Sequence, residues 1–137
     1  MPNFRYLLDT NMVSELIKNP QGMVAQRMLS LGLEKLCCTS IIVACELRYG
    51  VAKKNSAKLS FNVEQVLSSL PILSLESPTD KVYGKIRVEL ESRGLPIGSN
   101  DLLIAAHALS LGLTVVTANE REFSRVKKLQ VENWLNV

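Results

Sequence analysis

The sequence predicts an α/β protein, a three-layer α/β/α sandwich with a mostly parallel central sheet. Short apolar segments typical of buried strands alternate along the chain with segments whose apolar residues recur at helical spacing. The strand segments are apolar on both faces, which is typical of a parallel sheet covered by helices. Because internal repeats and long linkers are absent from the sequence, residues 1–137 are expected to form a single domain.

The strands are expected over 6–9, 36–39, 72–75 and 113–117, with a possible edge strand over 131–135. The first helix should follow the first strand directly, capped by Thr10 or Asn11. Asn19-Pro20 interrupts it, and it resumes over 23–31. Ser40 is a good N-cap for a helix over 41–51.

The second half of the chain continues the alternation. An amphipathic helix over 59–70 is followed by Ser77-Pro78-Thr79-Asp80, which predicts a serine-capped helix that ends at Gly94. After a loop over 95–100, a helix over 102–111 is apolar nearly all round and should be buried. A short helix is expected over 123–126.

Composition limits the classes of function. The net charge of +3 is compatible with an anionic partner such as nucleic acid, but aromatic residues make up only 5%, which argues against a base-stacking platform. The apolar runs are too short for a membrane span, and the first residues lack the apolar segment of a signal peptide, so a cytoplasmic protein is expected. Cys37, Cys38 and Cys45 show no metal or redox spacing and are expected to be reduced thiols in the core.

Several acids occupy positions where a core would exclude them. Asp9 ends the first strand, Asp101 opens the apolar helix, Glu46 lies in an apolar helix, and Asn119 and Glu122 follow the fourth strand. Ligands of parallel sheets bind at the carboxyl ends of the strands. Carboxylates about 4 Å apart repel by roughly 4 kcal/mol per pair at an effective dielectric near 20, so a cluster must take up protons or hold a cation. Oxygen ligands suit Mg²⁺ or Mn²⁺.

Each acid also has a structural explanation when it is taken alone. Asp9 and Asp101 could simply start helices. Glu46 could reach solvent or pair with Arg48 or a nearby lysine, and Glu122 could be a surface residue that pairs with Arg121 or Arg125. His107 lies about 240° around its helix from Asp101, so we expect it to be structural rather than a ligand.

The ordered set of these segments resembles PIN-domain proteins, most closely the VapC-type toxins of bacterial toxin–antitoxin pairs. The resemblance covers essentially the whole chain and rests on the following segments: Leu7-Leu8-Asp9-Thr10-Asn11, the Glu46 helix, Ile97-Gly98-Ser99-Asn100-Asp101 leading into Ile104-Ala105-Ala106-His107-Ala108, Val115-Val116-Thr117-Ala118-Asn119 with Arg121-Glu122-Phe123, and Glu132-Asn133-Trp134.

The resemblance implies a Mg²⁺- or Mn²⁺-dependent endoribonuclease whose metal site corresponds to Asp9, Glu46 and Asp101. It also implies a homodimer held inactive by a cognate antitoxin, and an RNA substrate that is commonly transfer RNA. Many PIN domains carry an aspartate after the fourth strand, where this chain has Asn119, and Glu122 is the candidate to take that place.

Supporting roles and rival functions complete the prediction. Thr117 and Asn11 are expected to position carboxylates or substrate, and backbone phosphates could contact basic residues (Lys53, Lys54, Arg87, Arg93, Arg121 and Arg125). The dimer is expected to use helix 59–70 or helix 23–31. The alternatives are a catalytically silent RNA-binding or scaffolding PIN domain, and a phosphatase with Asp9 as nucleophile. The phosphatase needs a second aspartate where this chain has Asn11.

Overall fold

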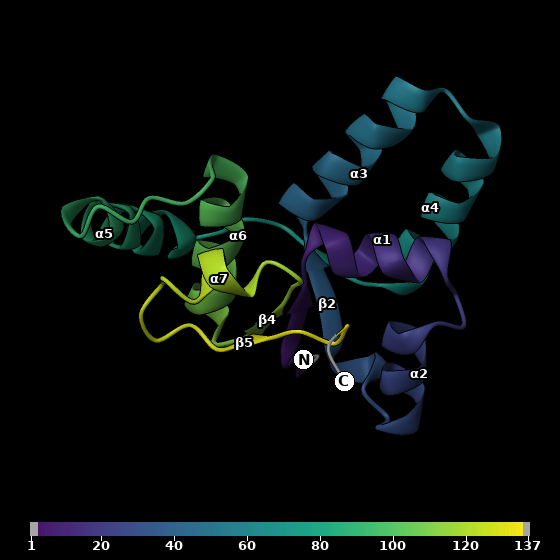
Figure 1. The fold of residues 1–137 in the computed structure, drawn as a ribbon, viewed down its shortest axis with the longest axis horizontal. Coiled ribbons are helices and arrows are strands. Elements are labelled where there is room, and N and C mark those ends of the chain that lie inside the picture. The colour runs from purple at the N-terminus through teal and green to yellow at the C-terminus, as the bar shows by residue number, and fades with distance from the viewer. Residues whose placement is uncertain (1–2, 136–137) are drawn as a thin grey trace.

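The computed structural model describes residues 3–135 and has one five-stranded parallel sheet with helices on both sides (Figure 1). The strands are β1 (Tyr6–Leu8), β2 (Cys37–Ser40), β3 (Ile72–Leu73), β4 (Thr114–Val116) and β5 (Val131–Glu132). The helices are α1 (Thr10–Lys18), α2 (Met23–Ser30), the short 3-10 helix η1 (Glu34–Leu36), α3 (Ile41–Lys54), α4 (Ala57–Ser69), α5 (Thr79–Ser92), α6 (Ser99–Leu111) and α7 (Glu120–Phe123). The predicted three-layer α/β fold is therefore confirmed; residues 1–2 and 136–137 of the expected domain lie outside the described residues.

The strand order is β3-β2-β1-β4-β5, with β1 in the centre. The register pairs Leu7 with Cys38 on one side and with Val115 on the other. The chain builds the sheet outward from β1 to β3, then crosses to the other side of β1 for β4 and β5. The point of reversal lies between β1 and β4, and such a point opens a crevice at the carboxyl ends of the two strands.

The core fills both faces of this sheet. Figure 1 shows α1, α3 and α4 on one side and α5 and α6 on the other. Leu7 and Leu8 are completely buried, and so is Ile104 of α6, as its apolar sequence predicts. Trp134 packs edge-on against Tyr6 with ring centroids 5.1 Å apart, which anchors the end of the chain beside β1.

The cysteines only partly follow the prediction. Cys37 and Cys38 are buried, and burial raises the pKa of each thiol to about 12. Cys45 is exposed, so its expected place in the core is wrong. The reason is that α3 turns Val43, Ala44 and Leu47 toward the core, which leaves Cys45 facing solvent.

Three predicted helix starts are displaced. Asp9 is the N-cap of α1, so Thr10 and Asn11 are helical residues rather than caps. α5 begins at Thr79 after Pro78, so the Ser77 cap is wrong. α6 begins at Ser99, inside the expected loop.

Two other boundaries differ in the last part of the chain. α7 spans Glu120–Phe123 rather than 123–126, and β5 has only two residues. Ser40 does cap α3, because its hydroxyl accepts from the Ile42 N–H at 3.1 Å. The same hydroxyl lies 2.9 Å from His107 Nδ1, which confirms a structural role for that buried histidine. None of the helices within residues 3–135 is long and apolar enough to cross a membrane.

Candidate active site

Four acids from separate segments converge at the carboxyl ends of β1 and β4. Asp9 follows β1, Asp101 lies in the first turn of α6, Glu46 lies on α3 and Glu122 on α7. Burial, together with the charges of Asp9, Glu122 and Glu46, raises the pKa of Asp101 to about 6. Because all three neighbours act on one carboxyl group, the structure brings together the four acids that the sequence singled out.

Asp9 is the most enclosed member of the cluster, with only 3% of its surface exposed. Its N–H donates to the Val116 carbonyl at 2.9 Å, which fixes it at the junction of β1 and β4. Burial raises the pKa of Asp9, and hydrogen bonds oppose that rise. The main one comes from the Thr117 hydroxyl, 2.8 Å from Asp9 Oδ2, and a longer one of 3.4 Å comes from Asn11 Nδ2.

Thr117 and Asn11 act as positioning groups in this geometry. The completely buried Thr117 hydroxyl accepts from the Asn119 N–H at 2.9 Å, so it is oriented to donate to Asp9. Asn11 Oδ1 accepts from the Ala118 N–H at 2.9 Å. Asn11 is an amide without an acidic proton, and its side chain is already engaged. It cannot serve as the second acid that the phosphatase alternative requires.

Asn119 joins two carboxylates. Its Nδ2 donates to Asp101 Oδ2 at 3.2 Å and to Glu122 Oε2 at 2.9 Å. The other oxygen of Glu122 accepts from the Gly98 N–H. These bonds, the Gly98 one first, hold the pKa of Glu122 below its usual range. Asn119 and Glu122 thus occupy the site together rather than as alternatives.

Glu46 completes the cluster from the side of α3. Its Oε1 accepts from the Thr10 hydroxyl at 2.5 Å. The alternative in which Glu46 pairs with Arg48 does not hold, since Arg48 pairs with Glu64. Within residues 3–135, none of the four acids forms an ion pair with a lysine or arginine. The charge of Arg125 acts on Glu122 without an ion pair, so most of the negative charge of the cluster is left for a ligand to balance.

The donor set fits a hard divalent cation. All four side chains offer carboxylate oxygens, which are the ligands that Mg²⁺ and Mn²⁺ prefer. Across the described residues, no three His, Cys, Asp or Glu side chains form a ready-made cage for one ion. Mg²⁺ commonly needs no such cage, because it binds through one or two carboxylates and keeps waters or substrate phosphates as further ligands.

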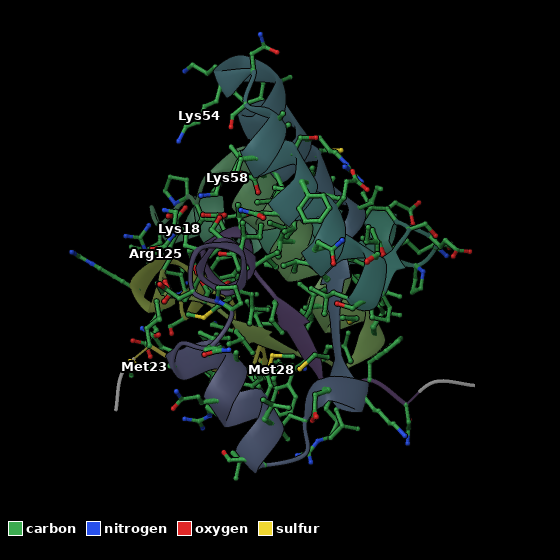
Figure 2. All side chains as sticks on the ribbon, turned by 90° about the vertical axis from the view of Figure 1, so that its right-hand side faces the viewer. Lys18, Met23, Met28, Lys54, Lys58 and Arg125 are labelled. Atoms are coloured by element: carbon green, nitrogen blue, oxygen red, sulfur yellow. The ribbon has the colours of Figure 1, made fainter. Side chains whose placement is uncertain are left out.

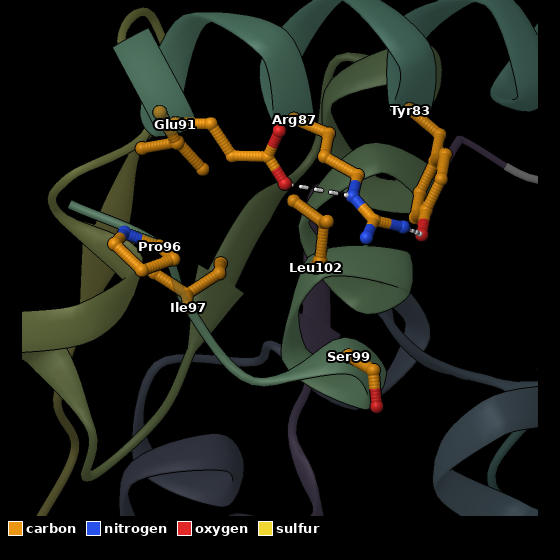
Figure 3. A pocket seen from close by; sticks show the side chains of 8 residues that line it. Tyr83, Arg87, Glu91, Pro96, Ile97, Ser99 and Leu102 are labelled. Carbon is orange, nitrogen blue, oxygen red and sulfur yellow. Dashed lines mark hydrogen bonds and ion pairs between the residues drawn. The ribbon is translucent and has the colours of Figure 1, made fainter. Parts of the chain in front are cut away.

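Two of the six basic residues predicted to contact phosphate, Arg87 and Arg93, are engaged by acids of α5. A cavity of about 150 Å³ opens between α5 and α6 beside Ser99, and Figure 3 shows Arg87 on its wall. Arg87 is held there by Glu91 and the Tyr83 hydroxyl, at 3.2 and 2.9 Å. Arg93 binds both oxygens of Glu89. Hydrogen bonds use two of the five N–H donors of Arg87 and three of those of Arg93, so a phosphate would share each guanidinium with its present partners.

Two groups at the site were missed in the sequence. The Gly98 N–H anchors Glu122 across 24 residues, and Thr10 was expected to cap α1 but instead binds Glu46 across 36 residues. The Gly98 contact leaves no local sequence signal, because it depends on how α6 packs beside α7. The Thr10 hydroxyl could be identified as polar and near the strand end, but not its partner.

Comparison with known proteins agrees with this geometry. The family model for the PIN domain matches residues 6–129. Ribonuclease VapC2 of Rickettsia felis is 38% identical over 130 residues, which cover 94% of this chain and 97% of that protein. The tRNA(fMet)-specific endonuclease VapC of Shigella flexneri is 37% identical, over 95% of this chain and 98% of that protein.

Solved structures give the same result. In the crystal structure of VapBC2 from Rickettsia felis bound to a promoter DNA fragment, one chain is 40% identical. It superposes with a TM-score of 0.86 over 96% of this chain and 99% of that one. A chain of VapBC-1 from nontypeable Haemophilus influenzae is 33% identical, with a TM-score of 0.82 over 97% and 100% of the two chains. The chain described here belongs to the PIN-domain family, among its VapC ribonucleases.

Proposed function

We propose that this protein is a toxin-type endoribonuclease that depends on a divalent metal ion and is neutralised by a cognate antitoxin. The observation that carries the proposal is the convergence of Asp9, Glu46, Asp101 and Glu122 without an ion pair to a lysine or arginine among the described residues. PIN-domain ribonucleases generally depend on divalent metals, and the oxygen-only donor set favours Mg²⁺ or Mn²⁺ here.

Asp9, Asp101 and Glu46 are the residues that would hold the metal. When bound, such an ion lowers the pKa of a coordinated water and offsets the charge that develops on the scissile phosphate. Thr117 and Asn11 keep Asp9 oriented by their hydrogen bonds. Asn119 and the Gly98 N–H hold Glu122 beside Asp101, where its carboxylate can orient a water or complete the acidic set.

Transfer RNA is the proposed substrate class, because the Shigella flexneri relative is named a tRNA(fMet)-specific endonuclease. Cleavage of tRNA would stop translation, and it places the action of the protein in the cytoplasm. The structures named VapBC2 and VapBC-1 support a protein partner. Chemistry supports it too, since an arginine from a partner would match the unpaired carboxylates in charge and in its paired-donor geometry.

A homodimer remains part of the proposal. Of the two helices expected at its interface, α4 buries Val63 and Leu67 in the core but exposes Phe61. The other helix, α2, exposes Leu29 near its end. These exposed apolar side chains are the parts of the two helices that remain available for a partner.

Cleavage of purified RNA tests the enzyme. The protein is incubated with a tRNA pool in Mg²⁺, in Mn²⁺ and in EDTA, with Asp101→Asn as the inactive variant and Lys35→Gln as a matched control far from the cluster. The expected result is metal-dependent cleavage by the wild type and the control only. Absence of both cleavage and divalent-metal binding would favour the silent RNA-binding or scaffolding domain.

The toxin part has a separate test. The gene is expressed with and without the neighbouring open reading frame. Growth arrest that the second protein relieves is expected, whereas undisturbed growth at confirmed full expression contradicts the toxin function.

A further inference from the structure

A groove with two lysines leads away from the acidic cluster. It lies between α1, α3 and α4 and encloses about 220 Å³. Thr10 and Glu46, which are hydrogen-bonded to each other, line it together with Lys18 and Lys54. Apolar side chains of the three helices complete its walls: Ile17, Leu47, Val51, Leu59 and Val63. One continuous surface therefore has carboxylate and ammonium groups on its lining.

Each of the two lysines follows a member of the hydrogen-bonded pair Thr10 and Glu46 at the same spacing along its helix. Lys18 follows Thr10 by eight residues on α1, and Lys54 follows Glu46 by eight residues on α3. Eight helical residues advance about 12 Å along the axis. Because helical side chains lean toward the N-terminus of their helix, we expect the side chains of Lys18 and Lys54 to lean toward Thr10 and Glu46. Figure 2 shows Lys18, Lys54 and Lys58 along one side of the molecule.

The lysines of this region have no acidic partner among the described residues. Within residues 3–135, Lys18, Lys54 and Lys58 form no ion pair. The neighbouring Lys53 differs, since its ammonium lies 5.9 Å from the centre of the Tyr49 ring. Lys53, Arg87 and Arg93 thus each have a partner, whereas Lys18, Lys54 and Lys58 have no acidic partner among the described residues. Lys18 was not among the residues that the sequence suggested for phosphate contacts.

We infer that this groove binds the RNA backbone on one side of the cleaved bond, with Lys18 and Lys54 as phosphate-positioning residues. The inference rests on the proposed ribonuclease function and adds the path of the substrate. A strand with one phosphate per roughly 3.4 Å of axial rise passes three to four phosphates in 12 Å. The lysines therefore contact phosphates a few nucleotides from the scissile one.

The salt dependence of RNA binding tests this path. Asp101→Asn is combined with Lys18→Gln, Lys54→Gln or both, and binding of fluorescein-labelled tRNA is followed by anisotropy between 50 and 200 mM salt. Each lost contact to a single strand should reduce the slope of log K against log salt by about 0.7, so the double variant loses about 1.4. Lys35→Gln removes the same charge from η1, at the amino end of β2, and should leave the slope unchanged.

Cleavage kinetics supply the second readout. In the otherwise wild-type protein, the double substitution should weaken tRNA binding on the order of tenfold and raise KM more than it lowers kcat. If the wild type cleaves tRNA but both lysine variants match Lys35→Gln in slope and KM, the inference is overturned while the ribonuclease function stands. Unchanged cleavage with weakened neutralisation by the partner protein also overturns it and assigns the groove to that partner. A wild type that cleaves no RNA refutes the proposed function, and with it this path.

Discussion

Replacing Asp101 with asparagine should stabilise the metal-free protein even though it removes a proposed metal ligand. Burial, followed by the charges of Asp9, Glu122 and Glu46, raises the pKa of Asp101 from 3.8 to about 6. One pKa unit corresponds to about 1.4 kcal/mol, so the ionised carboxylate costs the folded state up to about 3 kcal/mol at pH 7. An asparagine carries no charge and avoids this cost.

Two effects reduce the expected gain. The Asp101 carboxylate is only partly buried, so water screens part of the repulsion. An acid in the first turn of a helix is also favoured by about 0.3–1 kcal/mol, and the substitution loses that. The bond from Asn119 Nδ2 is retained, because the asparagine carbonyl can accept it. A net gain of about 1–2 kcal/mol remains.

Urea unfolding in EDTA measures the gain. With a slope of about 1–3 kcal/mol per molar urea, the midpoint should rise by roughly 1 M at pH 7. The sign of the pH dependence follows from the raised pKa: the native state binds more protons than the unfolded state between pH 3.8 and about 6, so wild-type stability falls as pH rises through that window. The advantage of the variant should therefore shrink to about one third by pH 4.5. A less stable variant, or a difference independent of pH, refutes the clustering of the acids.

Three further predictions test the site with four substitutions. Asp9→Asn should abolish metal-dependent RNA cleavage while urea unfolding stays cooperative; cleavage by fully chelated protein would contradict the metal role. Glu122→Gln should slow cleavage more than Asn119→Ala, because only Glu122 brings a carboxylate, and the reverse order in matched rate measurements would assign the role to Asn119. Thr117→Val leaves buried polar groups without a partner, so it should cost about 1–3 kcal/mol in urea unfolding. It should also raise the pKa of Asp9 further, observable in a carboxyl NMR titration, and an unchanged Asp9 pKa would mean that the hydroxyl is not its main donor.

The sheet could be predicted because the amino-acid composition of its strands indicates that both of their faces are buried. Tyr6–Leu8 is apolar on both faces, as are Val115 and Val116 of β4, and such segments are typical of a parallel sheet covered on both faces. The position of Asp9 followed from the same pattern, since a residue directly after a buried strand lies at the edge of the sheet where ligands bind.

Helix starts were less predictable because several residues nearby could serve as the cap. Ser77 offers a hydroxyl before Pro78, but α5 begins at Thr79 without a side-chain cap. Thr10 has a hydroxyl that could cap the helix, but this hydroxyl donates a hydrogen bond to Glu46 instead. In both cases tertiary contacts decide between local options of similar free energy, and the sequence window holds no information on those contacts.

The way the acids are held explains why the site remains receptive to a cation. Each carboxylate receives at least one neutral donor: Thr117 for Asp9, Thr10 for Glu46, Asn119 for Asp101, and Gly98 for Glu122. Neutral donors orient the oxygens without cancelling their charge, whereas an arginine or lysine would have done both. An aspartate at position 119 would have added a fifth carboxylate beside two others, at roughly 4 kcal/mol of repulsion for each pair about 4 Å apart. Asn119 with Glu122 therefore keeps the number of acids at four and ties two of them together, which leaves the charge of the site to be balanced by the proposed metal ion.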